Sequence, residues 1–349
     1  MNTENMNSEE KATTSTTSGT STTETKKSIY SLIEEEIKSM DISDEAKKRK
    51  LKKLAKLKKQ QLNVMLVGAT GSGKSSTVNA LFDMSVAKVG EGVDPETRKV
   101  TEFQLDNLTV WDTPGLGDGV EKDQEIADEI LLKLQEKDSE GEQLIDLVIM
   151  VVDASSKDLG NYYTIINDIL IPEFGDLASK KIVIALNQSD IAMKGTHWDS
   201  ENNKPDDVLE TFLKKKAASV RARIKENTGL DLKPVCYCAG YSENGVQRKP
   251  YNLTKLLYHI VKAAPKAKRL TIAENLNNDS ANWAYNEDVK YSESLKKDFG
   301  DIVVDCLGEG MDTGCDIGGD LLGIPGMIVG AVIGGVIGGV AGVIKAIAS

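Results

Sequence analysis

Short apolar runs alternate with helical stretches through the middle of this chain. The apolar runs have the length and composition of buried parallel strands, and residues 100–105 add a hairpin strand before the second of them. The runs occupy residues 63–68, 108–112, 147–153, 181–186 and 233–237, and the helical stretches occupy residues 74–82, 122–135, 162–170, 206–226 and 251–263. This order predicts an α/β fold with a doubly wound, mostly parallel sheet, in which ligands bind at the carboxyl ends of the strands.

The composition is that of a globular protein with one large domain or two smaller ones. The chain has 349 residues, 40% of them hydrophobic, and 43 Lys and Arg against 54 Asp and Glu give a formal net charge of −11. These values exclude a fully disordered chain and a disulfide-stapled mini-protein, and they argue against a protein that coats nucleic acid over its whole surface. Four cysteines and the lack of a recognisable signal peptide favour a cytoplasmic location.

Two segments precede the alternating region, which we expect to form a domain over residues 63–268. Residues 1–27 are rich in Ser and Thr and predict a disordered tail. Residues 28–62 predict two helices, the second capped by Ser43 and carrying nine Lys or Arg over residues 47–59. This basic helix could bind anionic lipid headgroups or RNA phosphates, or it could pack on the domain through its narrow leucine stripe.

The C-terminal part of the chain divides into an acidic segment and a glycine-rich tail. Residues 269–320 are acidic and predict a helical linker region, whereas residues 321–349 predict an apolar tail with 24 uncharged residues over 321–344. As a helix, those 24 residues would reach about 36 Å, enough to cross a bilayer, and glycine at every fourth position allows close helix packing. Three interpretations stay open: a membrane-inserting helix or hairpin, a glycine zipper buried in a soluble assembly, and a tail that folds against the domain.

A glycine-rich motif follows the first apolar run and opens the first helical stretch. It reads Gly-Ala-Thr-Gly-Ser-Gly-Lys-Ser over residues 68–75. Its spacing and context indicate a phosphate-binding loop, whose backbone N–H groups converge on phosphates at a helix N-terminus. We expect Lys74 to reach the β- and γ-phosphates and the Ser75 hydroxyl to bind Mg²⁺. The residues predicted to contact the nucleotide in this region are Gly68, Thr70, Gly71, Ser72, Gly73, Lys74, Ser75 and Ser76.

Two later motifs indicate which nucleotide is bound. The sequence Trp-Asp-Thr-Pro-Gly over residues 111–115 follows a predicted strand, which places Asp112 to hold Mg²⁺ and the Gly115 N–H to sense the γ-phosphate. After a later strand, the sequence Asn-Gln-Ser-Asp begins at Asn187 and also supplies Gln188. The carboxylate of Asp190 could accept two hydrogen bonds from the N1–H and 2-amino groups of guanine, a pair of donors that adenine lacks.

In this order, the three motifs resemble those of a P-loop GTPase of the translation-factor-related class. The chain is similar to the bacterial Era-like (HSR1-type) membrane-associated GTPases over residues 63–265. The resemblance implies that the protein hydrolyses GTP, with GTP or GDP and Mg²⁺ as its ligands. It implies that Thr97 is the switch I threonine that closes on Mg²⁺ and the γ-phosphate, with Thr101 as the alternative. It also implies that the loop of Cys238 and Ala239 meets the guanine base.

The catalytic residues implied by the resemblance are Lys74, Thr97 and Gly115, but the sequence departs from the GTPase pattern. Leu116 occupies the position at which Ras-like members have a water-orienting glutamine, and leucine cannot hold water by hydrogen bonding. Gly71 occupies the position at which some Era-like relatives have a K⁺-binding asparagine. The phosphate loop resembles those of septins, immunity-related GTPases and the AIG1 group, in which a partner subunit or a switch residue completes the site.

These departures lead to a hypothesis about catalysis and to three candidate functions. We expect slow intrinsic hydrolysis, and we hypothesise that nucleotide-dependent self-association supplies the missing group, with Arg98 or Lys99 as the cation. The favoured function is a nucleotide switch for self-assembly or membrane association, in the cytoplasm or at a membrane. One alternative is a membrane-active or structural protein whose tail inserts or oligomerises under nucleotide control. Another is a ribosome- or RNA-associated GTPase that acts through the basic helix.

Overall fold

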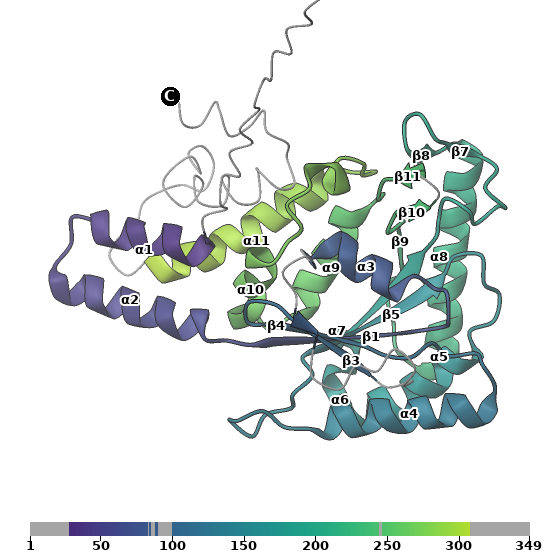
Figure 1. Ribbon diagram of the computed structural model, residues 1–349, viewed down its shortest axis with the longest axis horizontal. Helices are drawn as coiled ribbons and strands as arrows, with labels where there is room; N and C mark the ends of the chain where they lie inside the picture. The colour runs from purple at the N-terminus through teal and green to yellow at the C-terminus, as the bar shows by residue number, and fades with distance from the viewer. Residues whose placement is uncertain (1–27, 83, 85–87, 90–99, 244–245, 308–349) are drawn as a thin grey trace, which may run out of the picture.

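The centre of the molecule is a seven-stranded sheet with the strand order β2-β3-β4-β1-β5-β6-β9 (Figure 1). The structure, a computed structural model, describes residues 28–82, 84, 88–89, 100–243 and 246–307. The strands are β1 (Leu62–Gly68), β2 (Lys88–Val89), β3 (Thr101–Gln104), β4 (Leu108–Asp112), β5 (Leu147–Asp153), β6 (Ile182–Asn187) and β9 (Val235–Cys236). Strands β4, β1, β5, β6 and β9 are parallel, and β2 and β3 join them as an antiparallel edge. The predicted α/β fold with a mostly parallel sheet is confirmed.

Alternate side chains of the central strands enter two separate cores. On β1, Val64 and Leu66 pack into one core, whereas Met65 and Val67 pack into the other, and the whole strand is buried. Because both faces of the sheet are covered, the strand needs apolar residues at every position rather than at every second one. This requirement explains why the strands are visible in the sequence as continuous apolar runs.

Helices cover both faces of the sheet (Figure 1). One core is closed by α4 (Val120–Gln135), α5 (Gly160–Thr164), α6 (Ile171–Phe174), α7 (Ala178–Lys181) and α8 (Asp207–Thr228). The other is closed by α1 (Ile29–Ser39), α2 (Asp44–Lys58), α3 (Lys74–Leu81), α9 (Leu253–Ala263), α10 (Arg269–Glu274) and α11 (Lys290–Leu307). Short 3₁₀ helices lie at Gly175–Leu177, Lys266–Lys268 and Ser280–Trp283. The domain is therefore built of three layers, with the sheet in the middle.

The helix predicted over residues 162–170 is longer and less regular than expected. Helix α5, a π-helical turn at Ile165–Leu170 and helix α6 follow one another without a break. Pro172 lies near the start of α6 and has no N–H to donate, so the ordinary hydrogen-bond ladder cannot run through it. The other predicted helices of the domain match α3, α4, α8 and α9 to within two residues at either end.

The helices before and after the central region belong to one layer. Ser43 caps α2 as predicted, because its hydroxyl accepts a hydrogen bond of 3.3 Å from the Ala46 N–H. Ile33 and Ile37 of α1 are fully buried in the same core as Phe299 of α11. Two segments that are far apart in sequence therefore complete a single apolar core.

The glycine-rich tail lies outside the described residues. Among the helices that the structure describes, none combines the length and apolar composition needed to cross a bilayer.

Two small hairpins extend from the carboxyl side of the sheet, β7 (Trp198–Asp199) with β8 (Lys204–Pro205), and β10 (Tyr241–Glu243) with β11 (Val246–Arg248).

Candidate nucleotide-binding site

The phosphate-binding loop lies between the carboxyl end of β1 and the start of α3, where the sequence predicted it. Gly73, the residue before α3, has a φ angle of +88°, and a Cβ there would lie 2.2 Å from the side-chain nitrogen of Asn187. Glycine is therefore required at this position by its backbone conformation and by the close approach of Asn187. The amide of Asn187 uses this space to donate a 2.9 Å hydrogen bond to the Ser72 carbonyl.

The ammonium of Lys74 is held inside the loop. Lys74 is buried, and its Nζ donates hydrogen bonds to the carbonyl oxygens of Gly68 at 3.0 Å and Ala69 at 3.2 Å. Burial lowers the pKa of Lys74, and the nearby Asp112 carboxylate opposes that shift. A buried cation held by backbone carbonyl oxygens is well placed to exchange them for phosphate oxygens.

Ser75 and Asp112, the predicted Mg²⁺ ligands, lie in direct contact. The Ser75 hydroxyl donates a 2.7 Å hydrogen bond to Oδ2 of Asp112, while Oδ1 of Asp112 is buried without a hydrogen-bond partner in the described part of the chain. Burial raises the pKa of Asp112, and the hydrogen bond from Ser75 opposes the shift. A hydroxyl beside a carboxylate with an unused oxygen is an all-oxygen donor set, which suits Mg²⁺.

The loop at residues 113–116 lies directly against the phosphate-binding loop. A Cβ on Gly115 would lie 2.5 Å from the Thr70 backbone nitrogen, so only glycine fits at this contact. Leu116 donates its N–H to the Gly68 carbonyl at 3.1 Å and accepts from the Thr70 N–H at 3.0 Å. Its side chain is 2% exposed and packs into the core. The side chain at the predicted position of the water-orienting glutamine therefore lies in the core and does not line the cavity described below.

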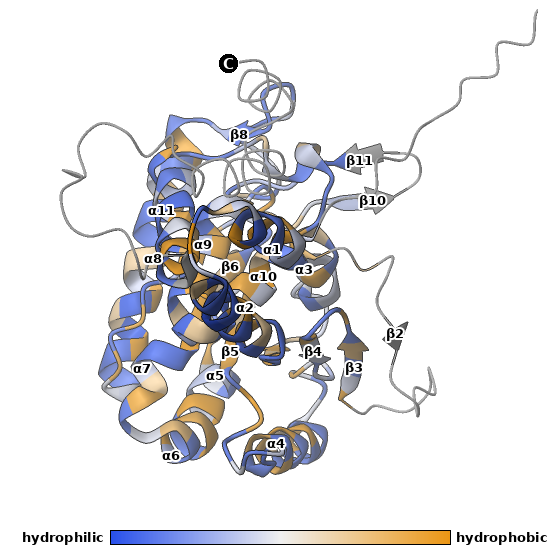
Figure 2. Cartoon of the chain, turned by 90° about the vertical axis from the view of Figure 1, so that its left-hand side faces the viewer, coloured by the Kyte–Doolittle hydropathy of each residue, from blue (hydrophilic) through white to orange (hydrophobic). Residues whose placement is uncertain are grey.

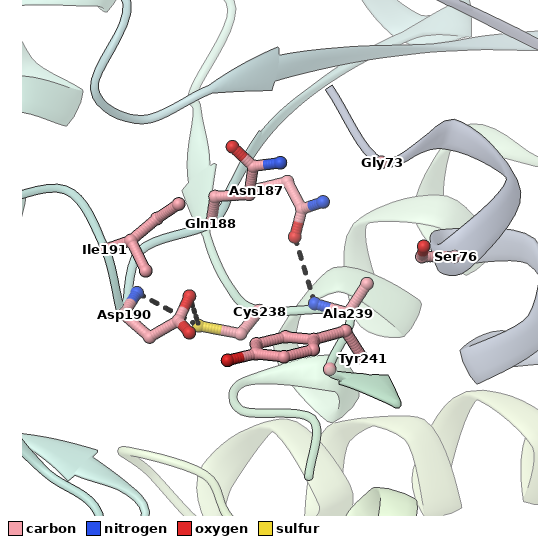
Figure 3. A pocket seen from close by; sticks show the side chains of 10 residues that line it. Gly73, Ser76, Asn187, Gln188, Asp190, Ile191, Cys238, Ala239 and Tyr241 are labelled. Carbon is pink, nitrogen blue, oxygen red and sulfur yellow. Dashed lines mark hydrogen bonds between the residues drawn. The ribbon is translucent and has the colours of Figure 1, made fainter. Parts of the chain in front are cut away.

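The predicted base-recognition residues meet around one cavity of about 400 Å³ (Figure 3). Asn187 connects the two sides of this cavity, since its Oδ1 accepts from the Ala239 N–H at 2.9 Å while its amide reaches the phosphate-binding loop. Gln188 also reaches that loop, through a 2.8 Å hydrogen bond to the Gly71 carbonyl. The cavity is lined by Gly73, Ser76, Asn187, Gln188, Asp190, Ile191, Cys238, Ala239, Gly240 and Tyr241.

Asp190 is held at the far end of the cavity by Cys238. The Cys238 thiol donates to Oδ1 of Asp190 at 3.3 Å, and the Asp190 backbone N–H lies 3.3 Å from the same sulfur (Figure 3). Burial and the nearby carboxylate raise the pKa of the Cys238 thiol well above its usual value, so the thiol stays protonated and can donate. The Asp190 carboxylate is thus fixed in orientation before any base arrives.

Two residues of the β10–β11 hairpin also belong to the site, and the sequence did not indicate them. Arg248 Nη1 lies 3.7 Å from Oδ2 of Asp190, within ion-pair distance but too far for a hydrogen bond. The Arg248 guanidinium lies 5.8 Å from the centre of the Tyr241 ring, which lines the cavity. Gly240 directly precedes β10, and a Cβ there would lie 2.5 Å from the Arg248 carbonyl oxygen.

A tyrosine from α5, Tyr162, joins the phosphate-binding loop to β5 by two hydrogen bonds. The Tyr162 hydroxyl accepts a hydrogen bond of 3.1 Å from the Ala69 N–H and donates one of 2.9 Å to the Val151 carbonyl. No motif or periodicity in the sequence indicates this contact, because it joins residues that are 93 positions apart.

The predicted switch region is described only in part. Thr97, Arg98 and Lys99 lie outside the described residues. Thr101, the alternative switch threonine, lies on β3 opposite Asp112 of β4. The assignment of the switch threonine and of the catalytic cation therefore stays a prediction.

Comparison with known proteins agrees with the motifs. The family described as "50S ribosome-binding GTPase" matches residues 63–188. The tRNA modification GTPase MnmE of Mesomycoplasma hyopneumoniae (strain 7448) is 36% identical over 106 residues, which cover 29% of this chain and 22% of that protein. The chain thus spans about a fifth of the length of the curated relatives it matches.

Solved structures give a more distant likeness. Toc33 from Arabidopsis thaliana, in a dimerization-deficient mutant, has 16% identity and a TM-score of 0.41, covering 68% of this chain and 96% of that chain. LeoA, a bacterial dynamin GTPase from ETEC, has 18% identity and a TM-score of 0.36, covering 79% of this chain and 47% of that chain. Residues 63–188 are thus similar to a 50S ribosome-binding GTPase domain, in agreement with the phosphate-binding loop and the two later motifs.

Proposed function

We propose that this GTPase binds GTP and GDP with Mg²⁺, hydrolyses GTP slowly on its own, and acts as a switch for self-assembly or membrane association. The observation that carries the proposal is the position of Asp190, which is buried and oriented at the end of a cavity that opens onto the phosphate-binding loop. Guanine offers adjacent N–H donors to such a carboxylate, whereas adenine would leave it unpaired.

In this proposal the phosphate end of the site is assembled from the phosphate-binding loop, the loop at residues 113–116 and the switch region. The backbone N–H groups of the loop and the Lys74 ammonium bind the phosphates, and Lys74 gives up its carbonyl partners to do so. Ser75, Asp112 and Thr97 would hold Mg²⁺, which when bound neutralises charge that develops on the phosphates. The Gly115 N–H is the sensor of the γ-phosphate.

Slow hydrolysis follows from the position of Leu116. An attacking water needs a hydrogen-bonding side chain to orient it, and the residue at this position is an apolar side chain buried in the core. A group from a second copy of the chain would restore catalysis, and Arg98 and Lys99 are our candidates for that group. This part of the proposal predicts that the active species is larger than a single chain.

Base recognition is tested by exchanging the carboxylate for an amide. In Asp190→Asn, we expect GDP affinity to fall by about a hundredfold, because the amide nitrogen cannot accept from guanine. Xanthosine diphosphate should bind this variant better than it binds the wild-type protein, because xanthine has a carbonyl in place of the 2-amino group. The measurement is nucleotide competition at equilibrium, with ADP as the control. Equal competition by ADP and GDP in the wild-type protein would show that the base assignment is wrong.

Membrane association is tested by sedimenting the full chain with liposomes in GDP and in a non-hydrolysable GTP analogue. We expect the bound fraction to depend on the nucleotide and to be lost when the chain ends near residue 308. The name of the matching family favours a ribosome- or RNA-linked role as the second candidate. Nucleotide-dependent binding to RNA, with no binding to liposomes, would favour that candidate instead.

A further inference from the structure

Helix α2 has one face that packs on the protein and one that faces solvent. Leu54 is buried in the core, and Leu51 and Leu57 pack against the same core from its edge. Helix α2 is mostly blue in the hydropathy view of Figure 2, because many of its residues are basic, and several of these are exposed. We call this the α2 cationic face, and it consists of the exposed residues Lys48, Arg49, Lys52, Lys56 and Lys59.

The charges of the α2 cationic face have no carboxylate partners in the described part of the chain. Lys48, Lys52 and Lys56 follow one another at intervals of four residues, a spacing at which like charges repel and destabilise a helix. On other helices, residues four positions apart carry opposite charges and form ion pairs, as Lys38 does with Glu34 and Lys214 with Glu210. Ion pairing within the helix therefore gives no reason for this pattern in a protein whose formal net charge is −11.

The position of α2 keeps this face away from the nucleotide. Helix α2 leads into the amino end of β1, whereas the phosphate-binding loop follows its carboxyl end. The seven residues of β1 separate the two by about 23 Å. A partner bound to the α2 cationic face would therefore leave the nucleotide site open.

The described part of the chain also ends beside α2. Helix α11 contacts α2, and the Lys53 ammonium donates to the backbone carbonyl of Asp305 near the end of α11. A second cation, Lys266, holds the Asp305 carboxylate at 2.6 Å. The sequence beyond this point includes the 24 uncharged residues 321–344. The described part of the chain thus ends beside α2, and the apolar segment follows later in the sequence.

We propose that the α2 cationic face docks on the anionic headgroups of a lipid bilayer. Charge complementarity favours a lipid surface. Stable membrane attachment takes an apolar anchor together with a basic patch, and the sequence supplies 24 uncharged residues over 321–344. Single-stranded RNA is a poorer fit, because α2 contains no aromatic residue on which a base could stack. The inference rests on the membrane association proposed above, and it adds the surface and the lipid class.

The test compares vesicles of neutral phosphatidylcholine with vesicles that contain 30% phosphatidylserine, using the full chain in a flotation assay. We expect wild-type protein to prefer the anionic vesicles. The triple variant Lys48→Gln, Lys52→Gln and Lys56→Gln should lose on the order of a hundredfold in apparent affinity for them. A matched variant with the same change in net charge, Lys137→Gln, Lys180→Gln and Lys225→Gln, removes exposed lysines on other elements and should behave as wild type. High salt should abolish the preference.

The outcomes separate this inference from the membrane association that it extends. If the wild-type protein floats equally with neutral and anionic vesicles, the tail accounts for binding and the α2 cationic face has no part in it. Equal losses in the two triple variants would also overturn the inference, because net charge alone would then explain the effect. If no vesicle is bound in any nucleotide state, the membrane association itself is wrong. Binding of poly(U) RNA without vesicle binding, lost in the α2 variant, would assign this face to RNA.

Discussion

At the scale of single residues, Asn187 links the two halves of the nucleotide site. Its amide donates to the phosphate-binding loop and its oxygen accepts from Ala239, so one side chain sets the distance between the phosphate end and the base end. Gly73 makes this possible by leaving the space that a Cβ would fill. The geometry of the site therefore depends on a glycine and an asparagine that are brought together only by the fold.

The Tyr241 ring lines the base cavity and should stack on a bound guanine. We expect Tyr241→Leu to weaken GDP binding by about tenfold, whereas Tyr241→Phe keeps the ring and should bind GDP as the wild type does. The measurement is GDP affinity by calorimetry, with pyrophosphate as the control ligand because it carries no base. A loss of pyrophosphate affinity in the leucine variant would mean that the substitution disturbs the whole site.

Local motifs could be predicted from the sequence, but the residues that support them could not. The phosphate-binding loop and Asp190 were identified because their spacing is fixed by the chemistry of the ligand. Tyr162 and Arg248 contribute through contacts with residues 93 and 58 positions away, and no periodicity or motif marks them. Such residues become visible only when the fold brings distant strands and loops to the same edge.

At the scale of elements, α11 is an integral part of the core rather than a surface addition. Leu295, Phe299, Ile302 and Val303 are all buried in the same core as α1 and β1. The sequence of this segment gave a weaker signal than the strands did, because α11 is amphipathic and acidic and its packing partners lie far away in the chain. The strands were predicted well because burial on both faces requires continuous apolar runs.

The contribution of α11 can be measured with two substitutions on the same helix. Phe299 is 1% exposed, so Phe299→Ala should destabilise the protein by about 3 to 5 kcal/mol through lost burial and an added cavity. Val304 is 45% exposed, and Val304→Ala should change stability by less than about 0.5 kcal/mol. The measurement is the free energy of unfolding in urea. Equal effects of the two substitutions would contradict the observed packing of α11.

A histidine on α9 should make stability depend on pH. The pKa of His259 is lowered to about 4, mainly by burial and further by the charges of Lys255 and Lys233. The centre of its ring lies 5.4 Å from that of Tyr258. The unfolded chain takes up a proton near pH 6.5 while the folded protein does not, so stability is complete above that pH and is lost as the pH falls toward 4. At pH 5 we expect a loss of about 2 kcal/mol.

The control for this prediction is His259→Gln, which has no proton to gain in this range. Urea unfolding at pH 7.5 and pH 5 should show a smaller difference in the variant than in the wild-type protein. An unchanged pH dependence in the variant would assign the effect to other groups.

At the scale of the whole molecule, the candidate nucleotide site and the α2 cationic face lie at opposite ends of the parallel strands. The carboxyl edge carries the nucleotide site, and the amino edge carries the α2 cationic face. In our proposal a second chain completes catalysis at the nucleotide site, so it would have to bind at the carboxyl edge. Self-association and membrane docking therefore use separate surfaces in our proposal and need not compete.

Self-association should be visible in the kinetics of hydrolysis. We expect GTP turnover per molecule to rise with protein concentration, because a second chain supplies the group that Leu116 cannot. The measurement is initial phosphate release over a hundredfold range of concentration, with molecular mass measured in parallel in GDP and in a non-hydrolysable GTP analogue. Constant turnover over that range would contradict catalysis by self-association.

The pairing of α1 with α10, which lies far away in the sequence, also affects how this protein is made. The Ile29 N–H donates to the Glu274 carboxylate across 245 residues of chain. At the usual rate of synthesis, about 12 to 50 s pass between the emergence of these two residues from the ribosome. During that interval the apolar side of α1 lacks its partners on α10 and α11. Folding of this layer is therefore completed only late in translation. Until α11 has been synthesised, the apolar side of α1 stays exposed in the nascent chain and is a site at which aggregation could begin.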